Sequence, residues 1–134
     1  MKVIVCLDKS NGMLFNSRRQ SRDDALNNKV ASLVGDGKLY LSEYSSKLFE
    51  GKCALEISDD LGNVAGEDDF CFYENTPVDT EKANEIYIFK WNRDYPGDTY
   101  FNFSPKDNGF KCIKKEDFEG TSHKKITLEI YRRD

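Results

Sequence analysis

The chain has 134 residues, of which 38% are hydrophobic and 33% are charged, a size and composition expected of one domain spanning residues 1–134. Its formal net charge of −4, from 24 acidic and 20 basic side chains, gives no overall attraction for nucleic acid. The longest wholly apolar run, residues 3–7, is far shorter than the ~20 residues of a membrane-spanning helix. We therefore expect a soluble, cytoplasmic protein with no signal peptide, no membrane anchor and no nucleic-acid partner.

The first half of the chain alternates predicted strands with predicted helices. Residues 2–8 form the first strand and are apolar nearly throughout, which is typical of a strand covered on both faces. Apolar side chains then recur at helical spacing over residues 22–33, and a Gly-Asp-Gly sequence follows that helix. A strand at residues 38–43 leads into a second, short helix at residues 42–49, which begins at a serine suited to capping.

The second half of the chain is predicted to be mostly strand. Residues 70–73 are again apolar throughout, whereas residues 126–131 alternate apolar and polar side chains, as on a sheet with one wetter face. Residues 75–84 contain at most a turn or two. Five further strands are predicted, at residues 53–58, 69–74, 85–92, 110–114 and 124–132. Together with the first two, they predict a mixed seven-stranded sheet with few helices.

The cysteines and the single histidine form no recognisable metal motif. Cys6, Cys53, Cys71 and Cys112 each lie in an apolar or alternating stretch, and no two form a C-x-x-C pair. His123 has no second histidine with which to complete a tetrahedral set. We therefore expect buried free thiols in a reducing compartment and no bound metal.

Three blocks of sequence, in order along the chain, resemble one enzyme family. Residues 3–13 (VIVCLDKSNGM) resemble an opening strand with its mobile loop, and residues 39–51 resemble a strand that leads into a helix. The third block is the most specific: NEIYIFK at residues 84–90 is followed by YPGDTYF at residues 95–101. These blocks, with a closing hairpin at residues 110–133, resemble dihydrofolate reductase.

The resemblance implies a fold and a set of ligand sites. The implied fold is α/β, with a dihydrofolate reductase-like mixed, mostly parallel central sheet of about seven strands, few flanking helices and an antiparallel C-terminal hairpin. It also implies that Asp23 or Asp24 corresponds to the family's pterin-binding carboxylate and Thr99 to the threonine that supports it. These three residues are the catalytic candidates if the protein is active. The alternative is an acidic first turn of a helix and an ordinary strand threonine.

The residues around both implied ligand sites depart from the family pattern. The family's LPW is replaced here by the polar sequence SRRQSR at residues 17–22, which does not suit a dry pterin pocket. The family's Gly-Arg-x-Thr reads Ser-Glu-Tyr-Ser at residues 42–45, which places a glutamate where an arginine would meet phosphate. The Gly-Gly turn is replaced by FYENTP at residues 72–77, and the helix after it is nearly deleted. We therefore expect no NADPH binding in the family's manner, and no other cofactor.

Arg18, Arg19 and Arg22 form the only basic cluster outside the C-terminal end. An arginine presents a planar fork of donors, so the cluster is a candidate clamp for phosphate or another small anion. A solvated loop and helix start is the alternative. His123 lies at the entrance to the last predicted strand, and a role as general base would require a nearby nucleophile that the sequence does not identify.

Three functions remain open from the sequence. The first is a binding or regulatory protein, a pseudoenzyme inactive toward dihydrofolate that binds a small anion. The second is a divergent oxidoreductase that reduces a folate- or pterin-like substrate, the only case in which NADPH would bind. The third is an interaction module or homodimer, formed through the shortened side of the sheet, where loss of a helix would expose apolar sheet surface flanked by Phe72 and Tyr73.

Overall fold

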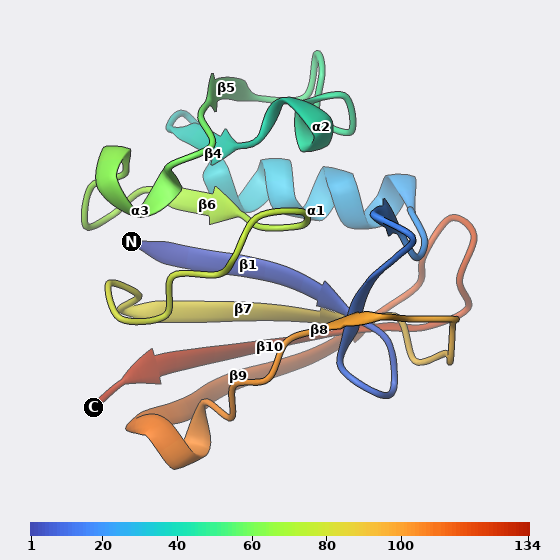
Figure 1. The fold of residues 1–134 in the computed structure, drawn as a ribbon. Coiled ribbons are helices and arrows are strands. Elements are labelled where there is room, and N and C mark those ends of the chain that lie inside the picture. The colour runs from blue at the N-terminus through green and yellow to red at the C-terminus, as the bar shows by residue number, and fades with distance from the viewer.

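The structure is a computed structural model that describes residues 1–134, and it consists of a large sheet, a small sheet and three helices (Figure 1). The strands are β1 (Lys2–Leu7), β2 (Gly12–Phe15), β3 (Arg18–Arg19), β4 (Lys38–Leu41), β5 (Ala54–Ile57), β6 (Phe70–Phe72), β7 (Glu85–Lys90), β8 (Thr99–Tyr100), β9 (Phe110–Phe118) and β10 (Ile126–Arg133). The helices are α1 (Asp24–Val34), α2 (Glu43–Ser46) and α3 (Leu61–Val64), with a 3-10 turn η1 (Lys106–Asn108). None of the helices has both the length and the apolar character to cross a membrane.

The large sheet has the seven strands predicted from the sequence, in the order β5-β4-β6-β1-β7-β10-β9. The first five are parallel to their neighbours, and β10 runs antiparallel to both β7 and β9. The fold class is therefore the mixed, mostly parallel sheet with a C-terminal hairpin that the sequence predicted. The apolar run of β1 lies at the centre of the sheet, where Val3, Ile4 and Val5 are fully buried.

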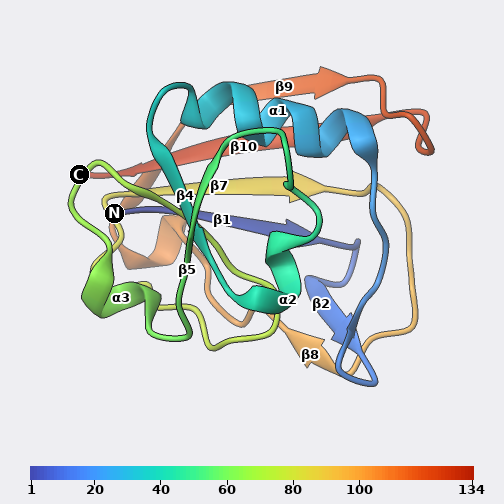
Figure 2. The same cartoon turned by 90° about the horizontal axis from the view of Figure 1, so that it is seen from above.

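Each face of the large sheet packs into its own core because neighbouring residues of a strand point to opposite faces. Ile4 lies in one core and Val3 and Val5 lie in the other. Helix α1 covers the first face with Leu26 and Val30, and Figure 2 shows it running along the strands on that side. The predicted helix at 22–33 is thus confirmed with a shift of one to two residues at its ends.

The structure also contains elements that the sequence did not predict. The small sheet has the order β3-β2-β8, and a two-residue turn joins β2 to β3. Asn16 and Ser17 in that turn both have left-handed φ angles, 51° and 62°. These angles are those of a type I′ turn, which matches the twist of a two-stranded hairpin. The expected signal, Asn-Gly, is absent, so the hairpin is not obvious in the sequence.

Two expectations about the middle of the chain are wrong. Helix α2 has four residues rather than the predicted span of 42–49, because the amides of Leu48 and Phe49 bond to carbonyls three residues back and tighten the chain into turns. Phe72 and Tyr73 were expected beside an exposed surface, yet each is only 2% exposed. Tyr73 packs in one core with Leu61 of α3, so irregular chain covers the shortened side of the sheet without a long helix.

All four cysteines are free thiols, as expected, but Cys71 alone is fully buried. Cys6, Cys53 and Cys112 are partly exposed, so their expected burial is only partial. No group of three or more His, Cys, Asp or Glu side chains is placed to hold a metal ion.

Candidate functional site

The candidate site lies at the carboxyl ends of the parallel strands, the edge at which open α/β sheets bind ligands. In Figure 1 the arrowheads of β1 and β7 point to this edge, where the small sheet also lies. Asp8 follows β1 and is buried; it accepts hydrogen bonds from the amides of Ser10, Gly12 and Tyr95 and from Nε2 of Gln20. Burial acts to raise the pKa of Asp8, but these donors lower it below its usual value. Asp8 therefore ties together the loops that follow β1 and β7.

Asp23 is the N-cap of α1, and both oxygens of its carboxylate accept hydrogen bonds from other groups of the chain. Oδ1 accepts from the amides of Leu26 at 3.2 Å and Thr121 at 2.9 Å. Oδ2 accepts from the amide of Ser122 at 2.8 Å and lies 2.9 Å from Nδ1 of His123. Burial acts to raise the pKa of Asp23, which is 1% exposed, but these four partners lower it to about 2. Asp23 is therefore an ionised carboxylate whose oxygens are both used in hydrogen bonds within the fold.

His123 is the functional residue whose surroundings the sequence did not reveal. Because an ionised carboxylate only accepts hydrogen bonds, Nδ1 of His123 carries the proton that faces Asp23. In the neutral ring Nε2 is then an acceptor, and two hydroxyl groups lie within reach of it: Tyr95 at 2.9 Å and Ser21 at 3.1 Å. The side chain is 3% exposed, and its ring stacks on Trp91 with centroids 4.7 Å apart. No sequence motif links these residues, because three separate segments contribute them.

Arg19 does not form part of an open anion clamp. Its Nε and Nη2 atoms donate to the two carboxylate oxygens of Glu74, at 2.9 and 3.1 Å, and its guanidinium lies 4.3 Å from the ring centre of Tyr44. Glu74 also accepts from Oγ of Ser45 at 2.7 Å. The predicted clamp of Arg18, Arg19 and Arg22 is therefore wrong for Arg19, whose charge is neutralised within the chain.

The remaining sequence candidates are placed apart from one another. Arg18 and Arg22 are exposed and make no ion pair, whereas Asp24 is exposed and pairs with Lys52 at 3.0 Å. Thr99 lies on β8 in the small sheet, where its Oγ1 donates to Asp98 at 3.3 Å. The expected pair between an aspartate of the first helical turn and Thr99 is therefore wrong. Asp23, rather than Asp24, is the carboxylate that faces the site.

A cleft of about 690 Å³ opens beside His123 and is here named the basic cleft. Its cationic members Lys9, Arg93, Lys124 and Lys125 are all exposed, and none of them makes an ion pair. No acidic residue lines the cleft. The complete lining is Lys9, Trp91, Asn92, Arg93, Ser122, His123, Lys124 and Lys125.

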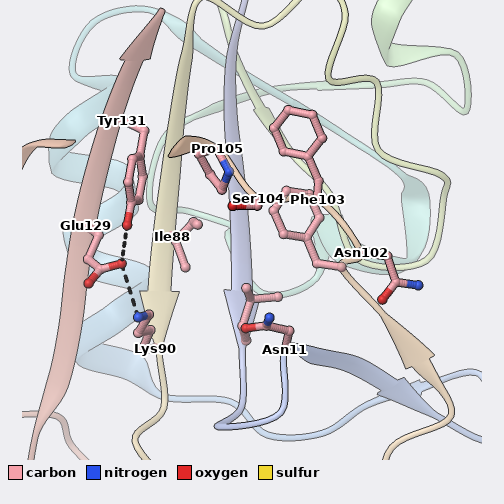
Figure 3. Close-up of a pocket in the computed structure, with 11 residues that line it drawn as sticks. Asn11, Ile88, Lys90, Asn102, Phe103, Ser104, Pro105, Glu129 and Tyr131 are labelled. Atoms are coloured by element: carbon pink, nitrogen blue, oxygen red, sulfur yellow. Dashed lines mark hydrogen bonds and ion pairs between the residues drawn. The ribbon is translucent and has the colours of Figure 1, made fainter. Parts of the chain in front are cut away.

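Two other clefts have fewer unpaired cations than the basic cleft. One, of about 520 Å³, is lined by Arg18 and the neutralised Arg19. Another, of about 480 Å³, lies on the far face of β7 and β10 (Figure 3). There the buried Glu129 accepts from the hydroxyl of Tyr131 at 2.9 Å and pairs with Lys90 at 3.2 Å, so its charge is balanced. The basic cleft is thus the place where unpaired positive charge gathers.

Comparisons with known proteins identify the fold. A search of the solved structures found 211 matching chains. One is dihydrofolate reductase from Enterococcus faecalis complexed with NADP(H) and RAB-propyl, with a TM-score of 0.69 over 99% of this chain and 95% of that one. The sequence identity is 8%, so the likeness concerns the fold alone. No protein-family model matches the sequence, and a search of the curated proteins gave no match. The chain has a dihydrofolate reductase-like fold, as its sequence predicted.

Proposed function

We propose that this protein is a binding or regulatory protein on a dihydrofolate reductase-like scaffold, inactive toward dihydrofolate, which binds a small anionic ligand in the basic cleft. The single observation that carries this proposal is the group of four unpaired cations around one cleft in a chain of net charge −4. A cleft lined by one sign of charge concentrates ligands of the opposite sign. The proposed ligand is a small polyvalent anion such as a phosphate ester or a polycarboxylate.

The environment of Asp23 supports the loss of reductase activity. The resemblance assigned this residue the task of binding a pterin ring, which needs an accessible carboxylate. Here both oxygens are occupied by four donors of the chain, and the residue is 1% exposed. A pterin would have to displace these donors, and leaving buried amides unpaired costs about 1–3 kcal/mol for each.

The environment of Glu74 supports the absence of NADPH. Its carboxylate lies beside α2 and accepts from Ser45 and Arg19, so a negative charge of the chain occupies the region where the resemblance placed a cofactor phosphate. The side chain of Glu74 is 10% exposed and is held on both oxygens. A phosphate entering here would meet like charge and would have to compete for Arg19. No cofactor is part of the proposal.

A thermal-shift panel with the purified protein tests the proposal. The panel contains pyrophosphate, citrate and ATP as anions, NADPH and dihydrofolate as reductase ligands, and sodium chloride at matched ionic strength. A ligand at one hundred times its dissociation constant adds about 2.7 kcal/mol to the stability of the folded state. We expect at least one polyvalent anion to raise the melting temperature beyond the salt control. NADPH, which carries phosphate groups of its own, should raise it no more than ATP does, and dihydrofolate should not raise it.

The variants in the panel locate the binding. Lys124→Ala with Lys125→Ala removes two cations of the basic cleft, whereas Lys106→Ala with Lys111→Ala removes two exposed, unpaired lysines elsewhere. The first pair should abolish the shift, and the matched control pair should keep it. A shift with NADPH, accompanied by its oxidation in the presence of dihydrofolate, would overturn the proposal.

A further inference from the structure

A serine, a histidine and an aspartate form a chain of hydrogen bonds at the edge of the site, with the histidine in the middle. Oγ of Ser21 is 3.1 Å from Nε2 of His123, and Nδ1 of the same ring is 2.9 Å from Oδ2 of Asp23. A hydroxyl bonded to a base that is itself oriented by a third group is the arrangement that activates a nucleophile. We propose that Ser21 is a nucleophile that His123 activates, and that it accepts the acyl group of small carboxylic esters. The inference does not depend on the proposed anion binding.

The base and its orienting group are held firmly. Asp23 is fixed by three backbone amides, and stacking on Trp91 restricts rotation of the His123 ring. The ionised carboxylate keeps the proton on Nδ1, so the lone pair of Nε2 is available to accept from a hydroxyl group, and Oγ of Ser21 lies 3.1 Å from it. Asp23 acts here as a positioning residue, and Ser21 and His123 are the groups that meet the substrate.

Ser21 lies outside the regular elements of the fold, next to backbone donors. It is half-buried and lies between β3 and α1, in a segment without regular secondary structure. The backbone amides of Ser21 and Arg22 donate to no atom of the chain. These two amides are the donors at hand for the negative charge that develops on an ester carbonyl oxygen under attack.

The reaction conserves atoms and charge. Oγ of Ser21 attacks the carbonyl carbon while Nε2 of His123 takes the hydroxyl proton, and Asp23 stabilises the resulting imidazolium. The carbon–oxygen bond to the leaving alcohol then breaks, and Nε2 gives its proton to that alcohol. Water, deprotonated by Nε2 in turn, attacks the acyl-serine, which releases the carboxylic acid and restores Ser21.

Tyr95 limits this activity, because its hydroxyl lies 2.9 Å from the same Nε2 atom. The neutral ring has one lone pair on Nε2, so Tyr95 and Ser21 compete to donate to it. Removal of the Tyr95 hydroxyl should leave Nε2 to Ser21 alone. A purely structural hydrogen-bond network would give no such gain.

Incubation of the full chain with a fluorophosphonate probe, followed by intact-mass and peptide mass spectrometry, tests the proposal. Hydrolysis of p-nitrophenyl acetate is measured in parallel. We expect a single adduct on Ser21, no adduct in Ser21→Ala, and an unchanged rate in the control Ser32→Ala, which alters an exposed serine of α1. His123→Gln should slow labelling at least ~100-fold, the lower end of general-base contributions.

Tyr95→Phe is the decisive variant, because it retains the ring and removes only the competing hydroxyl. It should label Ser21 several-fold faster than the wild-type chain. Circular dichroism and melting curves establish that each variant is folded. Absence of a Ser21 adduct in both the wild-type chain and folded Tyr95→Phe would overturn the proposal, and so would labelling confined to another residue.

Discussion

The Nδ1 atom of His123 lies 2.9 Å from the carboxylate of Asp23, although the two residues are 100 positions apart in the chain. The contact joins the N-cap of α1 to the loop between β9 and β10. The same loop sends the amides of Thr121 and Ser122 to the same carboxylate. One buried aspartate thus caps a helix, fixes a hairpin loop and orients the only histidine in the chain.

Asp23 should make the stability of the fold depend on pH in the acid range. Its pKa is lowered to about 2 from 3.8, so its contribution is complete above about pH 5 and is lost as the pH falls toward 2. At about 1.4 kcal/mol for each pKa unit, the contribution is about 2 kcal/mol. Urea unfolding of the wild-type chain and Asp23→Asn should show a stability gap that is constant from pH 7 to about pH 5 and narrows by about 2 kcal/mol below it.

Gly120 should tolerate no side chain, because it lies against the same carboxylate. A Cβ atom there would approach Oδ2 of Asp23 to 2.6 Å and the carbonyl oxygen of His123 to 2.8 Å. The amide of Gly120 also bonds to that carbonyl at 2.9 Å, which closes the turn between the two residues. Gly120→Ala should destabilise the protein by about 1–3 kcal/mol, the usual cost of overpacking.

Gly66→Ala is the matched control for that measurement. Its Cβ atom would meet only the half-buried carboxylate of Asp69, at 3.2 Å, which is the end of a side chain rather than backbone. Chemical denaturation of both variants should therefore show a loss confined to Gly120→Ala. Equal stability of the two variants would contradict the packing described around Asp23.

The pair of Arg19 and Glu74 should behave as a coupled unit. Removing either partner leaves the other charge in a region where the side chains are only 20% and 10% exposed. Arg19→Ala and Glu74→Ala should each cost about 1–3 kcal/mol, because each leaves a partly buried polar group without its partner. The double variant should cost less than the sum of the two, and additive losses in urea unfolding would show that the pair is not coupled.

Much of the fold was predictable because its signals are local. The seven strands of the large sheet carry β-branched and aromatic residues, and the apolar runs of β1 and β6 mark the middle of the sheet. Helix α1 follows from its apolar spacing. The hairpin of β2 and β3 was missed because Asn16 and Ser17 adopt left-handed angles without a glycine, and serine, unlike asparagine, is not enriched at such angles.

The site was less predictable because its contacts are distant in sequence. His123 looked isolated, since nothing near position 123 indicates that Asp23, Ser21 and Tyr95 converge on its ring. The prediction that the arginine cluster forms an anion clamp was wrong at Arg19 for a similar reason. Arg19 is adjacent in sequence to Arg18, but its partner Glu74 lies 55 positions away. The cations of the basic cleft likewise come from three separate loops.

Isothermal titration calorimetry with pyrophosphate tests the central claim most directly, when it compares the wild-type chain with the Lys124→Ala/Lys125→Ala variant in low and in high salt. We expect saturable binding of pyrophosphate by the wild-type chain, which weakens in high salt and is lost in the variant. The Lys106→Ala/Lys111→Ala control should bind as the wild-type chain does. Absence of binding by the wild-type chain in low salt, or equal binding by the wild-type chain and the cleft variant, would contradict it.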